Sequence, residues 1–481
     1  MAEKQSPDEI LTRLRSLDAK WLRIYWVDAT ASSKCRLVPM KRVCKTLESG
    51  KPLTISILQG ALGLLPCDIL APGVSATHTY NLHPDWSSLR RGPVEGHASC
   101  YGEFRQIDGS GCVLCPRRLL RKTVEQAAAS GLDFLIGFEI EFVALEKVPR
   151  NDQAAAAEGD GDAPKYRTIS HDGHAWSTSR ALAEWGRQDS IVTVLDEMVD
   201  LLDAADIPVE QLHAESTPGQ FEIVLPPLPP LQACDTLLHA RQIIESTAAR
   251  HGFRVTLHPK PSPGLPGTAA HAHMSVLKSS SSRSEASSPQ EEEEEEEEEE
   301  EAETEVYESF YAGILAHLPA LAAFTYANPA SYERAVDSAW AGGRWVAWGT
   351  QNRETPLRKC AGSHWEFKAL DGLANPFVAV SALLAAGADG VARATPLAAT
   401  WKDCEPDPAS LGPEQRAALG ITRELPRDLD QALGFLAADE TLEGLVGREF
   451  VRRYVDVKRA ELAFLMPMAD DERRQWLVER Y

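Results

Sequence analysis

Two glutamates at alternate positions of one apolar stretch are the first candidates for a catalytic or metal-binding role. Gly137–Glu146 reads Gly-Phe-Glu-Ile-Glu-Phe-Val-Ala-Leu-Glu. This alternation predicts a strand that points Glu139 and Glu141 to one face and packs its aromatic residues on the other. Two neighbouring acids in a partly buried strand need a cation, a shared proton or water. The solvated polar face of an edge strand is the alternative, and it is the commoner fate of such a pair.

A second acidic pair lies in Glu210–Leu225, where Pro218-Gly219 predicts a turn between two strands. A hairpin here would place Glu215 and Glu222 on adjacent strands, facing one another. A chance pairing of surface acids is the alternative. The existence of a second inward-facing pair favours a built site.

Histidines and a further glutamate lie on two later strands. His271, His273 and Ser275 fall on one strand face, and Glu366 lies on the alternating stretch His364–Lys368. Two histidines at this spacing can supply a ligand to a hard divalent metal beside carboxylates, or form a hydrogen-bonded core pair.

Two arginines and an aspartate complete the chemically interesting residues. Arg353 and Arg358 are candidates for phosphate contacts because a guanidinium matches the geometry of phosphate oxygens. Surface salt bridges are the alternative. Asp28 ends the first predicted strand, where capping a turn would be its ordinary role.

The elements that must position these residues suggest two domains in a chain of 481 residues. Residues 1–20 predict an amphipathic helix, and Trp21–Asp28 predicts a strand with Arg36–Pro39 as its hairpin partner. A helix is predicted from Cys115, with Pro116 in its first turn, to Gly131 just past its end. We place the domain boundary just before this helix, giving domains of residues 1–111 and 112–481.

The second domain is predicted to be rich in helices and to contain two irregular segments. The predicted helices are Ser190–Ala205, Cys234–His251, Val306–Phe324 and several within Asp428–Leu465. Asn151–Pro164 is rich in Ala, Gly and Asp and predicts a loose loop. Lys278–Glu305 is Ser-rich and then holds eleven consecutive glutamates, which predicts a disordered surface insertion.

Composition excludes several classes of function. The chain is 43% hydrophobic and 25% charged, and it has no apolar run long enough for a membrane span. Its net charge is −22; Lys278–Glu305, with two basic and fourteen acidic residues, contributes −12 of this. The remaining −10 disfavours nucleic-acid or anionic-membrane binding. Nine scattered cysteines indicate a reducing, cytoplasmic location, and Cys112 and Cys115 are interpreted as ordinary thiols.

Taken together, the motifs resemble those of the glutamine synthetase superfamily from Trp21 to about Leu465. The matching stretches are specific through their order and spacing: GFEIEF, ESTPGQFE, HPKP with GTAAHAHMS, NPASYER, NRETPLR, and WEFK with DGLANPF. The stretches VAWGTQNRETPLR and GSHWE further resemble the fungal FluG-type glutamine-synthetase-like proteins.

The resemblance implies an α+β fold with an N-terminal β-grasp-like domain and a catalytic domain whose antiparallel strands form a funnel with helices outside. It also implies ring-shaped homo-oligomers whose active sites are shared between neighbouring subunits. By the same resemblance, six residues match the ligands of two metal sites for Mg²⁺ or Mn²⁺: Glu141, Glu215 and Glu222 in one, and Glu139, His271 and Glu366 in the other.

The resemblance further implies ATP as cofactor, with glutamate and an amine as substrates. The matching cofactor positions are Glu210, Ser275, His273 and Arg358. The matching substrate positions are Arg334, Gly267 and Lys368, and the matching catalytic positions are Asp28 (offered by a neighbouring subunit), Arg353 and Glu215. A carboxylate must be phosphorylated before an amine can displace its oxygen, and the amine must lose a proton, which is work for Asp28 or Glu215.

Four departures from the family pattern surround the predicted substrate site. Ser338-Ala339-Trp340 replaces the flap segment that carries an ammonium-binding glutamate, and Pro266 opens an altered loop before the histidine. His364 and Lys368 stand where the family has arginines. We therefore predict a γ-glutamyl amide ligase that uses an organic amine rather than ammonia. The alternative is a scaffold or developmental regulator with little catalysis.

Overall fold

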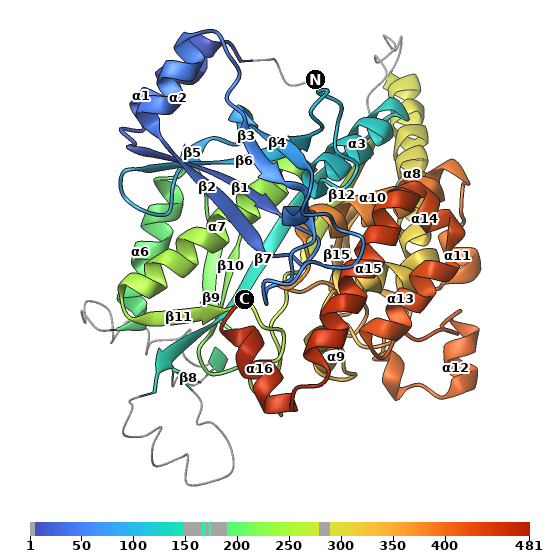
Figure 1. Ribbon diagram of the computed structural model, residues 1–481. Helices are drawn as coiled ribbons and strands as arrows, with labels where there is room; N and C mark the ends of the chain where they lie inside the picture. The colour runs from blue at the N-terminus through green and yellow to red at the C-terminus, as the bar shows by residue number, and fades with distance from the viewer. Residues whose placement is uncertain (1–4, 149–164, 170–172, 175–189, 279–288) are drawn as a thin grey trace.

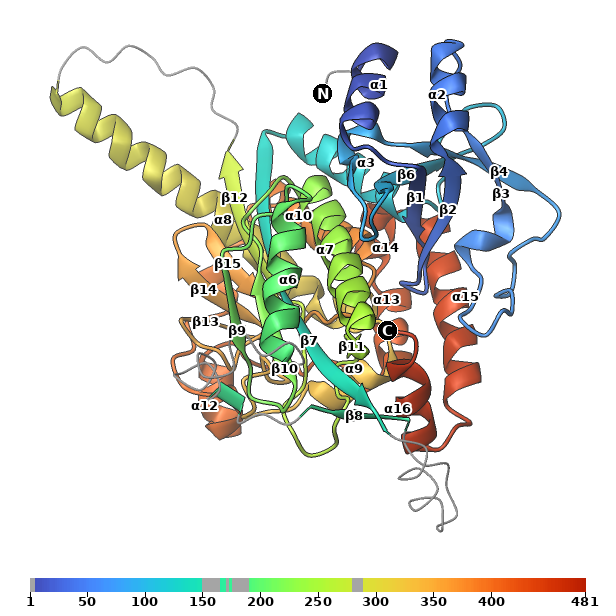
Figure 2. The ribbon, with the colours of Figure 1, turned by 90° about the vertical axis from the view of Figure 1, so that its left-hand side faces the viewer.

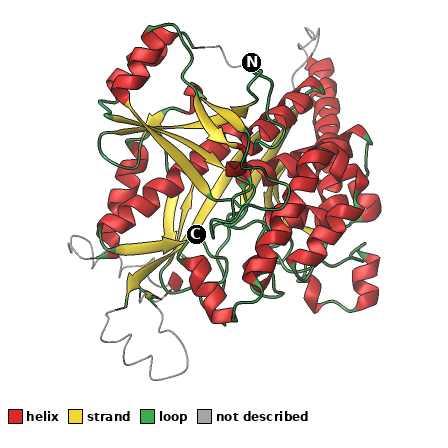
Figure 3. Cartoon of the chain, viewed as in Figure 1, coloured by secondary structure: helices red, strands yellow, loops and turns green. Residues whose placement is uncertain are grey.

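The computed structural model describes residues 5–148, 165–169, 173–174, 190–278 and 289–481. Two sheets lie at its centre, and helices pack on the outside of both (Figures 1 and 3). The α+β class predicted from the sequence is confirmed. The predicted loop Asn151–Pro164 lies outside the described residues.

The first sheet has six strands in the order β2-β1-β6-β4-β3, with β5 paired to β6. Its strands are β1 (Trp21–Val27), β2 (Ser33–Pro39), β3 (Ile55–Leu58), β4 (Thr79–Pro84), β5 (Arg90–Arg91) and β6 (His97–Arg105). Strands β1 and β2 form the predicted antiparallel hairpin, with Val27 opposite Ser33, whereas β1 runs parallel to β6.

Two helices, α1 (Pro7–Ser16) and α2 (Met40–Glu48), cover one side of this sheet. Ser6 caps α1 by accepting a hydrogen bond from the Glu9 amide, and the Glu9 carboxylate accepts one from the Ser6 amide. The helix then buries Ile10, Leu11 and Leu14 against the sheet, as its apolar spacing requires.

The second sheet has nine strands in the order β13-β14-β15-β12-β7-β10-β9, and β8 and β11 also pair with β7. Its strands are β7 (Leu132–Lys147), β8 (Tyr166–Thr168), β9 (Gln211–Ala214), β10 (Gln220–Val224), β11 (Phe253–Thr256), β12 (Ala272–Lys278), β13 (Trp348–Thr350), β14 (Leu357–Ala361) and β15 (His364–Phe367). The 16-residue β7 is its central element, because β12 pairs with its first half and β10 with its second half.

Helices enclose the second sheet and pack closely on one another. They are α3 (Pro116–Ala129), α6 (Ile191–Asp203), α7 (Pro230–Arg250), α8 (Pro289–Thr325), α9 (Pro329–Arg334), α10 (Pro376–Ala392), α11 (Leu397–Thr400), α12 (Pro413–Ala418), α13 (Leu429–Ala438), α14 (Glu440–Val446), α15 (Arg448–Leu465) and α16 (Asp470–Val478). Glycines let α8 and α10 approach, because a Cβ on Gly313 would lie 2.4 Å from the Ala386 carbonyl oxygen.

A buried arginine ties the first sheet to the helices of the second. Arg117 on α3 donates two hydrogen bonds to the Asp235 carboxylate on α7, at 2.9 and 2.7 Å, and one to Glu103 Oε1 on β6 at 2.8 Å. Its Nη1 also lies 2.8 Å from Asp85 Oδ2. Removing one partner from such a buried network leaves uncompensated charge. Residues from both sides of position 112 share one hydrophobic cluster, and the division at this position stays a prediction.

The glutamate run departs from the predicted disorder. Residues 279–288 lie outside the described part of the chain, but helix α8 begins at Pro289 and continues through the glutamates to Thr325. Figure 2 shows the first half of α8 projecting away from the body of the protein. The packed second half already meets the cost of nucleation, and each added glutamate, a good helix former, extends the helix.

Two further predictions concern membranes and cysteines. Among the described residues, no helix is both long and apolar enough to cross a membrane. All nine cysteines are free thiols, and Cys112 and Cys115 are buried, as expected of ordinary core thiols.

Candidate active site

One cavity of about 600 Å³ gathers most of the predicted site residues at the second sheet. Its lining includes Glu139, Glu141, Glu215, Glu222, Gly267, His271, His273, Arg334, Arg353, Arg358 and Lys368. These residues come from β7, β10, β12 and β14, from the end of helix α9 and from loops of the second sheet. Residues up to 229 positions apart in sequence therefore share one chamber.

The two strands at the base of the cavity bring two carboxylates together. Glu141 on β7 lies directly opposite Glu222 on β10 in the antiparallel register, so both side chains leave the same face. Both are buried. Burial, followed by repulsion from Glu222, raises the pKa of Glu141 to about 8, and burial also raises the pKa of Glu222. Such a pair favours a bound cation.

His271 points one ring nitrogen at three carboxylates. Its Nδ1 lies 2.6 Å from Glu139 Oε2, 3.3 Å from Glu366 Oε1 and 3.7 Å from Glu141 Oε1. Burial, together with the nearby Lys368 ammonium, lowers the pKa of His271 to about 4, so the ring is neutral at physiological pH. Although burial opposes ionisation of Glu139, hydrogen bonds from His271 and His273 hold the pKa of that carboxyl well below its usual range.

The partner of Glu222 on β9 differs from the prediction. Glu222 pairs with His213, and the expected partner, Glu215, lies one residue beyond the end of β9. The turn closes through a bond from the Glu215 amide to the Gln220 carbonyl, which shifts the facing residue by two positions. His213 Nε2 lies 3.1 Å from Glu222 Oε1, and this hydrogen bond raises the pKa of His213 to about 9.

Sequence reasoning assigned no role to His213 or to Gln220. His213, Glu215 and Glu222 form a group whose ligand atoms lie within 4.8 Å of one another. Gln220 donates to Glu141 Oε2 at 2.7 Å and thereby holds that carboxylate in place. The alternation of His213 with Glu215, and of Gln220 with Glu222, was the signal that could have identified both residues.

A loop approaches the carboxylates from the other side. The Ala269 amide donates to Glu141 Oε2 at 3.0 Å, and the Gly267 carbonyl accepts from Gln220 Nε2 at 3.1 Å. A Cβ on Gly267 would lie 2.2 Å from the Pro259 carbonyl oxygen and 2.8 Å from Arg334 Cγ. Only glycine fits this position without displacing the backbone.

Glu366 is the centre of a cationic group. It is buried on β15, where its two carboxylate oxygens accept from Arg358 Nη1 at 2.5 Å and from Lys368 Nζ at 3.1 Å. Although burial opposes ionisation, Lys368 and neighbouring charges lower the pKa of Glu366 to about 2. Arg334 is also buried, and its Nη2 lies 3.1 Å from His271 Nε2.

The segment that departs from the family pattern borders the same cavity. Trp340 lines it with 60% of its surface exposed, and its amide donates to Glu354 Oε1 at 2.9 Å. Ser338 and Trp340 have φ angles of 58° and 56°, in the left-handed region that such residues rarely occupy. Strain of this kind concentrates at functional sites.

Four predicted residues do not line the cavity of their own chain. Asp28 is buried in the first sheet, where its side chain pairs with Lys34 and accepts from the Thr30 hydroxyl at 2.7 Å. Glu210 is exposed beside β9, and Ser275 lies on β12 opposite Leu135. Glu366 is likewise absent from the cavity surface, although it contacts His271, which does line the cavity.

The donor set suits hard divalent cations. Oxygen-rich groups with ligand atoms within 4.8 Å of one another are formed by Glu139, Glu141 and His271, by Glu139, His273 and Glu366, and by His213, Glu215 and Glu222. Carboxylates with a few imidazoles are the ligands that Mg²⁺ and Mn²⁺ accept. The raised pKa of Glu141 is a second indication, because a bound cation would offset the repulsion from Glu222.

Comparisons with known proteins identify related sequences and structures. The family model "Glutamine synthetase, catalytic domain" matches residues 113–481. Protein fluG of Emericella nidulans is 39% identical over 465 residues, which are 96% of this chain. That relative is longer, and the chain spans about half (49%) of its length. A γ-glutamylpolyamine synthetase of Streptomyces coelicolor is 32% identical over 366 residues, covering 74% of this chain and 71% of the relative. A crystal structure of a glutamine synthase homolog has a TM-score of 0.73 at 26% identity, covering 96% of this chain and 99% of that one.

Proposed function

This chain belongs to the glutamine synthetase family, and we propose that it is an ATP-dependent carboxylate–amine ligase that forms γ-glutamyl amides with an organic amine rather than ammonia. The observation that carries the proposal is the convergence of four acidic side chains, four histidines and three arginines on one cavity. Such a site suits phosphoryl transfer, which depends on positioning and on charge neutralisation.

The residues in and beside the cavity fit two Mg²⁺ or Mn²⁺ ions, which the family implies together with ATP. Glu141, Glu215 and Glu222 would hold one ion, and Glu139, His271 and Glu366 would hold the other. When bound, these ions would neutralise phosphate charge and orient the oxygens of the reacting groups. The neutral state of His271 leaves a lone pair on its ring that a cation could accept.

The arginines divide into substrate and phosphate roles. Arg334 is buried, fixed beside His271 and turned to the cavity, which suits it to hold the carboxylate of a substrate glutamate beside Gly267. Arg353 and Arg358 also line the cavity, and Arg358 contacts Glu366; both would neutralise the transferred phosphoryl group. Glu210, Ser275 and His273 are proposed to contact the nucleotide.

The amine must lose a proton before it attacks the acyl phosphate. Glu215 lines the cavity and can accept this proton. Asp28 could serve only in a neighbouring subunit's site of a ring-shaped oligomer. In this chain its carboxylate is 0% exposed and paired with Lys34, so that role requires a rearrangement of the Asp28 turn on assembly.

Trp340 supports an organic amine as the acceptor. The exposed indole of Trp340 at the cavity border offers apolar surface and cation–π attraction to a substituted ammonium group. The flap glutamate that the family carries would instead attract ammonium itself. The γ-glutamylpolyamine synthetase relative has a name that specifies such an amine. We extend this substrate class to the present chain without naming one amine.

The test is phosphate release by the purified protein with ATP, Mg²⁺ and glutamate across ammonium, monoamines and polyamines, with products identified by mass. We expect turnover with one class of organic amine. Glu139→Ala should abolish it, whereas Glu146→Ala, on the same strand but in an exposed pair with Arg167, should leave it unchanged. Trp340→Glu should shift the preference towards ammonium, and an unchanged preference would count against the role of Trp340.

A scaffold or regulator with little catalysis is the second candidate. One observation favours it: Lys368 is buried and bonded to Glu366, which leaves its ammonium less available to a substrate than an arginine fork would be. ATP binding without turnover on any amine would establish this alternative and refute the ligase.

A further inference from the structure

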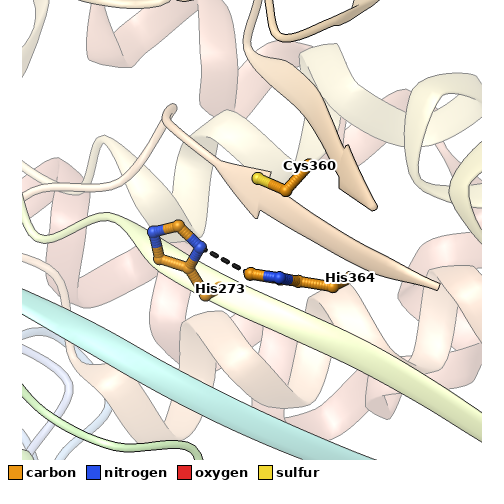
Figure 4. Close-up of side chains that lie close together, drawn as sticks. All are labelled: His273, Cys360 and His364. Atoms are coloured by element: carbon orange, nitrogen blue, oxygen red, sulfur yellow. Dashed lines mark hydrogen bonds between the residues drawn. The ribbon is translucent and has the colours of Figure 1, made fainter. Parts of the chain in front are cut away.

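A further metal-type cluster, which contains sulfur, lies beside the carboxylate groups described above. His273, Cys360 and His364 each offer a ligand atom, and these atoms lie within 4.8 Å of one another. Figure 4 shows the two imidazole rings side by side with the Cys360 thiol above them. The ligase proposed above assigns no role to Cys360 or His364.

Three adjacent strands supply the three side chains. His273 is on β12, His364 begins β15, and Cys360 is on β14. The register of β14 and β15 shifts between Lys359 and Ala361, so Cys360 is the extra residue of a β-bulge. Bulges re-aim side chains, and they recur next to functional sites.

The framework around the cluster is rigid. The Tyr311 hydroxyl on α8 lies 2.8 Å from the Met274 carbonyl oxygen and 2.9 Å from the Ser363 carbonyl oxygen, and its one proton is shared between these neighbours of the two histidines. Its ring stacks on Trp365, with centroids 4.2 Å apart. The metal-type cluster is therefore held from outside by contacts that do not involve its own ligand atoms.

The two imidazoles face each other through nitrogens. His273 Nδ1 lies 2.8 Å from His364 Nε2. Two nitrogen lone pairs cannot be this close without a proton or a cation between them. In a tetrahedral Zn²⁺ site with Zn–N bonds of about 2.0–2.1 Å, the two nitrogens would be about 3.3 Å apart. A movement of about half an ångström would therefore convert one arrangement into the other.

The other nitrogen of His273 has the partner that a metal-bound histidine usually has. His273 Nε2 lies 3.0 Å from Glu139 Oε1. A carboxylate that accepts from one ring nitrogen fixes the tautomer and leaves the other nitrogen as the ligand. Glu139 thus favours the tautomer in which Nδ1 of His273, the atom that faces His364, carries the lone pair.

From this geometry we propose that His273, Cys360 and His364 bind a thiophilic divalent cation, of which Zn²⁺ is the type. Two imidazoles and a thiolate are a ligand set that Zn²⁺ prefers and Mg²⁺ does not. Three protein ligands leave a fourth position for water or another donor. The cation would be coordinated by the thiolate of Cys360 and by one nitrogen lone pair of each ring. Its binding would release the thiol proton and any proton shared between the rings. The site does not depend on the proposed ligase activity.

The test uses the reduced full-length protein, freed of metal by a chelator and then held in excess Mg²⁺ to occupy the carboxylate sites. Co²⁺ is added as a spectroscopic substitute for Zn²⁺, because only a thiolate ligand produces a sulfur-to-cobalt charge-transfer band. We expect the band in wild type and its loss in Cys360→Ser. Cys44→Ser, which removes a partly exposed thiol on α2, is the matched control and should keep it.

Zn²⁺ affinity, measured by competition with a chromophoric chelator, gives a second readout. Loss of a ligand should weaken binding by at least about 100-fold in Cys360→Ser, since removing merely the partner of a ligand costs 10–100-fold. His364→Gln should weaken it comparably and covers the case in which the cysteine variant does not fold. A missing band in wild type, a band that survives Cys360→Ser, or equal Zn²⁺ affinity in wild type and both variants would overturn the site.

Discussion

Substituting Glu141 by glutamine should stabilise the metal-free protein at neutral pH while removing a proposed metal ligand. Glu141 is buried opposite Glu222, and its pKa of about 8 compares with an ordinary value of 4.5. Folding therefore takes up a proton, and stability falls as pH rises from about 4.5 through 8. Above pH 8 the loss of stability is complete.

The size of the effect follows from the same values. At pH 7 the folded state holds a proton on Glu141 that the unfolded chain has lost. This difference lowers the free energy of unfolding by about 1.36 kcal/mol for each pH unit above 4.5, or about 3 kcal/mol at pH 7. Glutamine takes up no proton. Its amide oxygen can accept from Gln220 and the Ala269 amide as the carboxylate does, and its NH₂ group can donate towards Glu222. With an unfolding entropy of about 2.1 cal/mol/K per residue, the gain corresponds to a melting temperature about 3 °C higher.

The assay is urea unfolding of wild type and Glu141→Gln in a chelator, at one protein concentration, at pH 4.5 and pH 7. The variant should be more stable by up to about 3 kcal/mol at pH 7 and nearly equal at pH 4.5. Glu146→Gln, at a half-exposed position of the same strand, should change stability by less than about 0.5 kcal/mol at either pH. Saturating Mg²⁺ should stabilise wild type by about 2.7 kcal/mol at 100 times its Kd and stabilise the variant far less. A variant no more stable than wild type at pH 7, or a gain independent of pH, would refute the reasoning.

Three further predictions concern the metal site, the buried arginine and the glutamate helix. The Mg²⁺ affinity of wild type, measured by calorimetry, should rise by up to about tenfold per pH unit above pH 6.5 and less steeply as pH approaches 8, because binding must displace the proton of Glu141; a flat profile would contradict this. Arg117→Ala should cost about 3–5 kcal/mol in denaturant unfolding, because it strands the buried carboxylate of Asp235, whereas Arg15→Ala, in an exposed pair with Glu48, should cost less than about 1 kcal/mol. Deleting residues 279–303 should leave the melting temperature nearly unchanged, and a large drop would show that the projecting part of α8 supports the fold.

Local patterns in the sequence were sufficient for the elements and for much of the site. The alternation in Gly137–Glu146 predicted that Glu139 and Glu141 share a face, and β7 has this arrangement. Period-two and period-3.6 patterns are properties of neighbouring residues, so they can be read without a structure. The order of the motifs likewise identified the family before any contact was known.

Other features depended on which strands meet and in what register. The turn after β9 places His213 rather than Glu215 opposite Glu222, and the bulge in β14 brings Cys360 beside His273 and His364. Each is a shift of one or two residues, and nothing in either strand alone specifies it. The glutamate run was predicted to be disordered because its own composition cannot bury apolar area, yet it continues a helix nucleated by packing further along the chain. Residue types and local alternation specified which side chains were available for chemistry and which face of a strand they occupied. Which of these side chains meet, and how their charges alter one another, depends on the pairing of distant strands, because register, burial and proximity arise only from that pairing.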